Sequence, residues 1–332
     1  MRDLSEFRTA KAFSYPDQAV YAAYACAEFG LIFSDLDGGT GLVFSVGSRE
    51  KTIHFGAGRC SWYPQNSATA STLASDKFFT NKILEAEGIA TLGGDYFFLH
   101  ARHRVHRPSG HERDDALGYF KALGGTAFVK PLTGSRGDFA QAVHGEPGLL
   151  RYLGEVSRYY DAILMQPIVS GKEYRVFLLD DEVLYTARKH PPSVVGDGVR
   201  TVRDFLIAHN ARLLTRGLSP VSITGDPDPA FDAVLSKGQR WEVPGRMNFS
   251  AGGTMRLESP DPAAVTLARK AAGALGLRAA GVDLFCDIDG QPGAIKIIEV
   301  NANPSIKLLE QSGRADLILK IWHHTFSAMG LL

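Results

Sequence analysis

The stretches IIEVNANPS, Ile297–Ser305, and GVDLF, Gly281–Phe285, decide how the C-terminal part of this chain folds. Apolar neighbours mark both as buried strands, and the turn signal DIDGQPG between them predicts an antiparallel hairpin. Side chains alternate between the faces of a strand, so Asp283 is assigned to one face of the first strand, while Glu299 and Asn301 share a face of the second.

If the turn centres near Gln291, Asp283 lies opposite Glu299, and facing Cβ atoms in such a pair are about 4.5 to 5.5 Å apart. Two buried carboxylates at that spacing repel each other, and burial of an uncompensated charge is costly. Asp, Glu and Asn offer oxygen ligands, which suit Mg²⁺, with Mn²⁺ as a substitute. A protonated carboxyl group or an arginine partner would also hold this pair, and the hairpin alone does not choose between these arrangements.

Composition and charge describe an ordinary globular chain. Its 332 residues are too many for one simple core and indicate two or three subdomains. The hydrophobic share is 45%, the charged share is 22%, and Lys plus Arg equals Asp plus Glu at 36 each. No net field therefore favours nucleic acid or a membrane surface as a partner, so any anion binding must come from local clusters.

The cysteines and the N-terminus predict a cytoplasmic protein. The three cysteines show no CxxC spacing, which disfavours a disulfide framework or a structural zinc site. The opening MRDLSEFRTAKAF lacks the apolar core of a signal peptide, and no run approaches the roughly 18 apolar residues that span a bilayer.

The periodicity of apolar residues and the positions of glycine and proline divide the chain into alternating helices and strands. We expect helices at 17–29, from Ser75 or Asp76 to Gly88, and at 202–214, 263–275 and 315–326, a strand–glycine loop–strand unit at 126–143, and a hairpin around 180–182. The chain is expected to form a small α/β cap at 1–75, a central subdomain at 76–168 and a C-terminal subdomain at 169–332.

The segment FVKPLTGSRGDF combines a lysine at the end of a strand with a glycine-rich loop. Lys130 is followed by Gly134, Ser135, Arg136 and Gly137. Glycines let backbone N–H groups approach phosphate oxygens, and the basic side chains supply charge. A flap that closes over phosphates fits this order better than a P-loop, in which the lysine follows the glycines. An ordinary glycine-rich hairpin turn fits it as well.

The hairpin around Asp180–Glu182 carries a third cluster. Glu173 and Arg175 share one strand face, and the return strand is expected to bring Arg188 and Lys189 alongside. A carboxylate beside three cations could bind a ribose hydroxyl together with phosphate or carboxylate oxygens. A solvent-facing ladder of salt bridges is the equally weighted alternative.

Taken in this order, these segments resemble the ATP-grasp superfamily, and within it the amide-ligase domain of cyanophycin synthetases and the glutathione-synthetase half of bifunctional glutathione enzymes. The resemblance runs from about Ser75 to Leu309. Its motifs are SDKFFTNKILEAEGI, FVKPLTGSRG, SGKEYRVFLL, RKHPPSVVGDGVRTVRDFLIAHN, NFSAGGT and GVDLF with IIEVNANP. It implies an ATP-grasp fold, in which two α+β subdomains grip ATP.

The resemblance also implies a nucleotide site. Lys77 and Lys130 would contact the ATP phosphates, with Lys82 as the second choice for the first of them, and the glycine-rich segment would form the phosphate flap. Gln166 and Val169 fall where the hinge between the subdomains reads the adenine, and Glu173 falls where a carboxylate holds the ribose. Members usually carry Glu at the position of Gln166, but an amide oxygen can still accept a hydrogen bond from the adenine amino group.

The same resemblance implies that Asp283, Glu299 and Asn301 are magnesium ligands. It thereby favours a metal at the hairpin over a protonated carboxyl group or an arginine partner. Arg175 and Arg188 match basic positions near the γ-phosphate and the acyl-phosphate. Many related ligases carry an arginine two residues before the first metal aspartate, where this chain has Gly281, as the cyanophycin-like branch does.

The implied activity is that of an ATP-dependent carboxylate–amine ligase that joins amino-acid-like or short peptide substrates through an acyl-phosphate. Two alternatives remain open: a small-molecule kinase that uses the same nucleotide site, and a nucleotide-binding regulatory module without turnover. Dimers are common among such ligases, although nothing in the sequence marks an interface.

Overall fold

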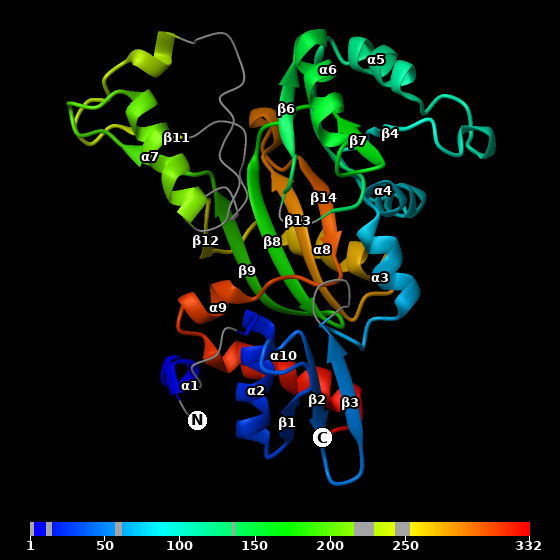
Figure 1. Ribbon diagram of the computed structural model, residues 1–332, viewed down its shortest axis with the longest axis vertical. Coiled ribbons are helices and arrows are strands. Elements are labelled where there is room, and N and C mark those ends of the chain that lie inside the picture. Colours follow the sequence, from blue (N-terminus) through cyan, green and yellow to red (C-terminus); the bar gives the residue numbers. More distant parts are fainter. Residues whose placement is uncertain (1–2, 11–14, 57–61, 135–136, 216–228, 243–252) are drawn as a thin grey trace.

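A computed structural model describes residues 3–10, 15–56, 62–134, 137–215, 229–242 and 253–332 (Figure 1). In this part of the chain, no helix combines the length and the apolar character that crossing a bilayer requires. The described structure is a mixed α/β arrangement with several antiparallel sheets.

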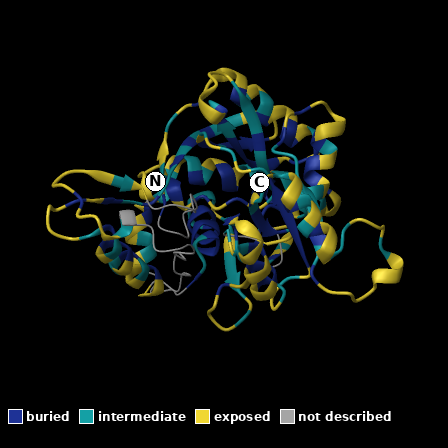
Figure 2. Cartoon of the chain, turned by 90° about the horizontal axis from the view of Figure 1, so that it is seen from above, coloured by how far each residue is buried: buried dark blue, intermediate teal, exposed yellow. Residues whose placement is uncertain are grey.

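A five-stranded antiparallel sheet forms the centre of the molecule, with the strand order β12-β9-β8-β13-β14. The strands are β8 (Lys172–Leu179), β9 (Glu182–His190), β12 (Thr254–Leu257), β13 (Ala279–Cys286) and β14 (Ile295–Asn301). The β8–β9 turn contains Asp180 at φ 52°, a left-handed conformation that aspartate tolerates better than most residues. Every residue of β13 except Phe285 is buried. Figure 2 shows the buried residues at the centre of the molecule, with exposed residues around them.

Helices α3 (Ala68–Ser75), α4 (Lys77–Ala86) and α8 (Pro262–Ala274) pack on one face of this sheet. Helix α8 faces the sheet with alanines, which let the helix approach the strands closely. Asp76 caps α4 by accepting hydrogen bonds from two backbone N–H groups of its first turn, and Gly88 follows the helix at φ 69°. The expected start and end of this helix are thereby confirmed.

A second, four-stranded sheet lies above the first in Figure 1, with the order β4-β7-β5-β6. It consists of β4 (Asp95–Phe98), β5 (Thr126–Pro131), β6 (Gln141–His144) and β7 (Ala162–Gln166) and shares a core with α5 (Arg113–Ala122) and α6 (Gly145–Val156). The short helix η1 (Arg104–His106) lies in the loop between β4 and α5. The expected strand–loop–strand unit corresponds to β5 and β6.

The N-terminal cap shares one hydrophobic core with the C-terminal helices and with the lower part of the central sheet. The cap comprises α1 (Leu4–Ala10), α2 (Asp17–Phe29), β1 (Ile32–Asp35), β2 (Val43–Gly47) and β3 (Thr52–Gly56), and it packs on α9 (Lys307–Gln311) and α10 (Ala315–Ala328). The expected helices at 17–29 and 315–326 are confirmed as α2 and α10.

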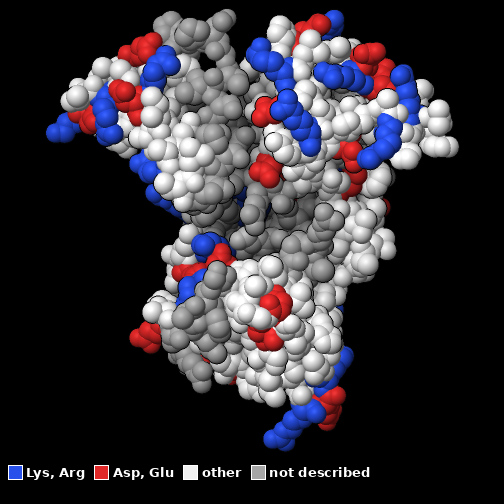
Figure 3. Space-filling model, viewed as in Figure 1, with Lys and Arg blue, Asp and Glu red and all other residues white. Residues whose placement is uncertain are grey.

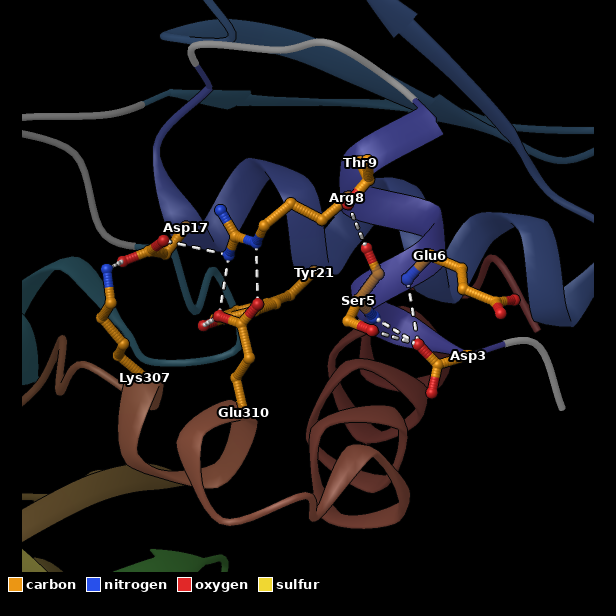
Figure 4. A network of polar contacts seen from close by, with 9 residues as sticks. All are labelled: Asp3, Ser5, Glu6, Arg8, Thr9, Asp17, Tyr21, Lys307 and Glu310. Carbon is orange, nitrogen blue, oxygen red and sulfur yellow. Dashed lines mark hydrogen bonds and ion pairs between the residues drawn. The ribbon is translucent and has the colours of Figure 1, made fainter.

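A network of charged side chains joins the two ends of the chain (Figure 4). The Arg8 guanidinium donates to both carboxylate oxygens of Glu310, over 2.7 and 2.8 Å, and to Asp17 over 3.0 Å. The Tyr21 hydroxyl donates to Glu310 over 2.7 Å, and Lys307 pairs with Asp17 over 3.1 Å. These contacts fix α9 against α1 and α2 at the border of the shared core.

The remaining elements form a small lobe at the upper left of Figure 1, with a core of its own. The lobe contains β10 (Ser193–Val195), α7 (Val202–Thr215), η2 (Pro229–Asp232) and β11 (Arg240–Glu242). Helix α7 confirms the helix expected at 202–214, and α8 confirms the one expected at 263–275.

The three-part division of the chain stays a prediction, although the cores describe how its boundaries pack. Ala70, Leu84 and Ile89 belong to the core under the central sheet, whereas the core of the upper sheet begins at Phe97. Helix α4 is thus packed on the C-terminal subdomain, although it precedes the upper sheet in sequence.

Candidate nucleotide and metal site

The β13–β14 hairpin has the expected pairing at Asp283, although a register shift between Asp283 and Leu284 displaces the part nearer the turn by one residue. Asp283 on β13 is paired with Glu299 on β14, and on the other side of β13 it is paired with Arg175 on β8. Glu173 and Arg175 lie on the same face of β8 by alternation, so this face of the sheet carries three carboxylates within three adjacent strands.

Asp283 is completely buried, and cations contact both of its oxygens. Arg175 donates from Nε to Oδ1 and from Nη2 to Oδ2, each over 2.7 Å, in a bidentate pair. The ammonium of Lys189 donates to the same Oδ2 over 2.7 Å. Burial by itself raises the pKa of Asp283, but Arg175 and Lys189 outweigh it and hold that pKa well below its usual range.

Lys189 connects Asp283 to Glu173. Its ammonium also contacts Glu173 Oε1, and both side chains are about 7% exposed. Burial raises the pKa of Glu173 even though Lys189 opposes this effect. Lys189 therefore lies beside Glu173, as expected from the sequence.

Arg188 is not brought together with this cluster, which corrects the expectation that both basic residues of the return strand would lie beside Glu173. Arg188 is paired with Tyr174 in the β8–β9 register, and its guanidinium lies over the Tyr174 ring and contacts Glu258 over 3.2 Å. Neighbouring residues on a strand point to opposite faces, so only one of Arg188 and Lys189 can face Glu173. Counting back from the turn, where Leu179 faces Glu182, would place Arg188 opposite Glu173. The register shift between Phe177 and Leu178 pairs Arg188 with Tyr174 instead and so brings Lys189 to the face of Glu173.

Glu299 and Asn301 are half-buried and lie beside Asp283 at the end of β14. Asn301 donates from Nδ2 to Glu299 Oε1 over 3.1 Å, so its own Oδ1 is the oxygen left for another partner. Within the described residues, Glu299 forms no ion pair with a basic side chain. Its carboxylate is the least neutralised of the three.

Gly281 allows the chain after β14 to pack directly against β13. A Cβ atom at this position would lie 2.7 Å from Pro304 Cβ and 3.6 Å from Arg175 Nε. The Arg175 guanidinium thus lies directly beside the backbone of Gly281.

Two lysines from the other side of the site face these carboxylates. Lys130, at the end of β5, is 5% exposed, and its ammonium forms no hydrogen bond or ion pair with the described residues. Burial lowers its pKa to about 8, while the nearby charge of Glu299 acts in the opposite direction. Lys77, at the start of α4, donates to the backbone oxygen of Gly134 over 3.1 Å, and burial lowers its pKa as well.

Lys82, the second choice for the first phosphate lysine, points away from this site. It is 54% exposed and pairs with Glu85 one helical turn later, over 3.0 Å. Of the two lysines in α4, only Lys77 reaches the end of β5.

The glycine-rich segment is described in part. Gly134 supplies the carbonyl group that binds Lys77, and Gly137 has φ 67°, in the left-handed region that favours glycine. Ser135 and Arg136 lie outside the described residues, as does most of the NFSAGGT motif.

Gln166 ends β7 with one unpaired oxygen. Its Nε2 donates to the backbone oxygen of Gly93 over 2.6 Å, which fixes the amide orientation, and its buried Oε1 has no hydrogen-bond partner among the described residues. Gly94 has φ 108°, and a Cβ atom there would lie 2.5 Å from Met165 O. Val169 is half-buried in the segment that joins β7 to β8.

The donor atoms of the hairpin suit magnesium chemically, although no cluster of three His, Cys, Asp or Glu side chains in the described parts is arranged to hold a metal. Glu299 offers a carboxylate without an ion pair, and Asn301 offers an amide oxygen. Asp283 offers the third oxygen donor, with Arg175 and Lys189 now in contact with it. The residues fit a hard cation by donor type.

Comparison with known proteins finds sequence relatives of this chain. The glutathione biosynthesis bifunctional protein GshAB of Streptococcus mutans is 29% identical over 259 residues, which cover 70% of this chain and 32% of that protein. The cyanophycin synthetase of Synechocystis sp. is 25% identical over 262 residues, which cover 71% of this chain and 28% of that protein. This chain thus spans about a third of the length of these relatives. No protein-family model matches it.

The crystal structure of a bifunctional glutathione synthetase from Pasteurella multocida matches with a TM-score of 0.51 at 19% identity, covering 91% of this chain and 44% of that one. The chain has the ATP-grasp ligase fold, as the sequence predicted. It is related to the ATP-grasp regions of GshAB proteins and cyanophycin synthetases.

Proposed function

We propose that this chain is an ATP-dependent carboxylate–amine ligase that forms an amide bond between amino-acid-like or short peptide substrates. The observation that carries the proposal is Lys130, a buried ammonium without a partner among the described residues, which faces the carboxylates of the β13–β14 hairpin. A buried cation without a partner is unfavourable unless a ligand supplies the anion, and a polyphosphate is an anion of suitable charge.

The two lysines and Gln166 would bind the nucleotide. Lys77 and Lys130 would supply positive charge from two elements for the phosphates, and Gly134, the first glycine of the glycine-rich segment, lies next to Lys77. Gln166 can only accept at Oε1, because its Nε2 is bound to Gly93. An adenine amino group is a donor that matches this oxygen. Val169 follows on the same connecting segment.

Magnesium would be held by Asp283, Glu299 and Asn301, and when bound it would neutralise phosphate charge, with Mn²⁺ as a substitute. Arg175 lies against Asp283 and would stabilise negative charge on the transferred phosphoryl group. Glu173, which pairs with Lys189, is the carboxylate that would bind the ribose hydroxyls. Arg188, on the opposite face of the sheet, is given no part in this chemistry.

The proposed reaction has two steps. A substrate carboxylate attacks the γ-phosphorus of ATP, and the bond from that phosphorus to the β,γ-bridging oxygen breaks. The products of this step are an acyl-phosphate and ADP. An amine then attacks the acyl carbon, inorganic phosphate leaves, and the amine gives up a proton to form the amide. The protein mainly positions the groups and neutralises charge. This requires no strong side-chain base if the amine arrives neutral.

The substrate class is inferred from the relatives. The names of the two curated relatives refer to glutathione biosynthesis and to cyanophycin synthesis. This chain aligns with about a third of each, so it shares a region with them rather than their whole length. Amino acids and short peptides are the substrates to test first.

The deciding experiment supplies ATP, Mg²⁺ and a panel of amino acids and short peptides, with the products read by mass spectrometry. A ligase yields ADP, phosphate and an amide in equal amounts. A kinase yields ADP and a stable phosphorylated product, and a regulatory module binds nucleotide without turnover. Either of the last two results would overturn the proposal, and Glu299→Gln serves as the inactive control.

A further inference from the structure

Lys189 contacts an oxygen of Asp283 that the proposed metal would also need as a ligand. Its ammonium contacts Asp283 Oδ2 over 2.7 Å and also contacts Glu173 Oε1, while Arg175 spans both oxygens of Asp283. Lys189 is about 7% exposed and Asp283 is not exposed at all. No oxygen of Asp283 is therefore without a cationic partner in this arrangement.

The charge of the cluster opposes a free divalent cation as well. The carboxylates of Glu173, Asp283 and Glu299 are outnumbered by the cations of Arg175, Lys189, Lys77 and Lys130. These seven side chains carry a net charge of plus one. Adding a divalent cation alone would raise that charge to plus three in a largely buried space, which is strongly unfavourable. The magnesium complex of ATP carries about minus two at neutral pH, so the cation can enter with compensation.

We infer that Lys189 is a positioning residue that holds Asp283 in the metal's absence and makes metal binding at this hairpin depend on bound nucleotide. This inference rests on the proposed function. Phosphate oxygens attract Lys189 and Arg175 as alternative partners, and Asp283 Oδ2 then becomes free for a metal. The arrangement also protects a buried carboxylate that would otherwise be left with only one cationic partner.

Mn²⁺ binding followed by electron paramagnetic resonance tests the inference without relying on turnover. The wild-type protein is expected to bind Mn²⁺ weakly, with a Kd above the millimolar range, unless ADP or a non-hydrolysable ATP analogue is present. Lys189→Met removes a charged hydrogen bond from Asp283, so it should lower the Kd for Mn²⁺ without nucleotide by about ten- to a hundred-fold. Arg188→Met is the matched control, because it makes the same charge change at the neighbouring residue on the opposite face and should leave this Kd unchanged.

A double variant separates contact from charge and guards against misfolding. Glu173→Gln with Lys189→Met keeps the wild-type net charge and leaves no buried glutamate without its lysine. It should still bind Mn²⁺ without nucleotide more tightly than the wild type does. If only the single variant gains affinity, net charge and not the Lys189 contact is the barrier, and the inference fails.

The outcomes also separate this inference from the proposed function. Tight Mn²⁺ binding by the wild-type protein without nucleotide overturns the inference. So does a folded Lys189→Met protein that binds Mn²⁺ only together with nucleotide, although that result leaves the proposed function standing. A wild-type protein that binds no nucleotide under any metal condition overturns the proposed function itself.

Discussion

Replacing Lys130 by methionine is expected to stabilise the nucleotide-free protein and to abolish its response to ATP. Lys130 is 5% exposed, and burial lowers its pKa from the usual 10.5 to about 8. The folded state therefore disfavours the charged ammonium. At 1.36 kcal/mol for each pKa unit, the difference corresponds to about 3 kcal/mol of folding free energy that is lost while Lys130 is charged.

The sign of the pH dependence follows from the lowered pKa. Between pH 8 and pH 10.5 the unfolded chain still holds the lysine proton that the folded protein has released, so the free energy of unfolding rises with pH. Below pH 8 both states are protonated and the full penalty applies. Methionine has a similar length and no charge, so the variant should lack this rise and exceed the wild type at pH 7 by up to about 3 kcal/mol.

Urea denaturation at pH 7, 8, 9 and 10 gives the unfolding free energies of the wild type and of Lys130→Met. Their difference cancels the contributions of groups that titrate in both proteins. Lys82→Met is the control, because Lys82 is 54% exposed and should show no such difference. Saturating ATP and Mg²⁺ should raise the Tm of the wild type and of this control but not that of Lys130→Met. A Lys130→Met protein that is less stable at pH 7 and keeps its response to ATP would refute the reasoning, since Lys130 would then be an ordinary structural cation.

Three further predictions concern the surrounding residues. Asp283→Asn should lower the free energy of unfolding by about 3 to 5 kcal/mol, because it removes the anion that binds two buried cations, whereas Glu299→Gln should lower it by less than about 1 kcal/mol. Both variants should lose magnesium-dependent ADP release, and equal unfolding free energies for the two would contradict the ion-pair role. Gln166→Leu should weaken ATP binding about tenfold in calorimetry and remove any preference over inosine triphosphate, whose base lacks the amino group; a preference that survives would exclude Gln166 from reading the base. Gly94→Ala should lower the Tm much more than Gly93→Ala does, because a Cβ atom at 94 meets a β7 backbone oxygen at 2.5 Å and one at 93 meets nothing within 4 Å; similar losses would show that the left-handed φ alone matters.

Local sequence was sufficient for several elements and for the pairing of Asp283 with Glu299, but it did not predict helices α3, α5 and α6. Asp76 as a cap and Gly88 as a stop predicted α4, and alternation around one turn placed Asp283 opposite Glu299. Such features depend on residues close together in the chain, so propensity, capping and period determine them. The motifs were sufficient for the ATP-grasp fold because their order along the chain is itself sequence information.

Tertiary structure alone decided which charges meet. The bidentate pair of Arg175 with Asp283 joins residues 108 positions apart, and no local pattern states which cation a buried carboxylate contacts. The sharing of Lys189 between Glu173 and Asp283 depends on the order of β9, β8 and β13 in the sheet. The register shift within the β8–β9 pair turns Arg188 to the other face. Coulomb energy depends on distance in space and on burial, and both are known only once the strands are assembled.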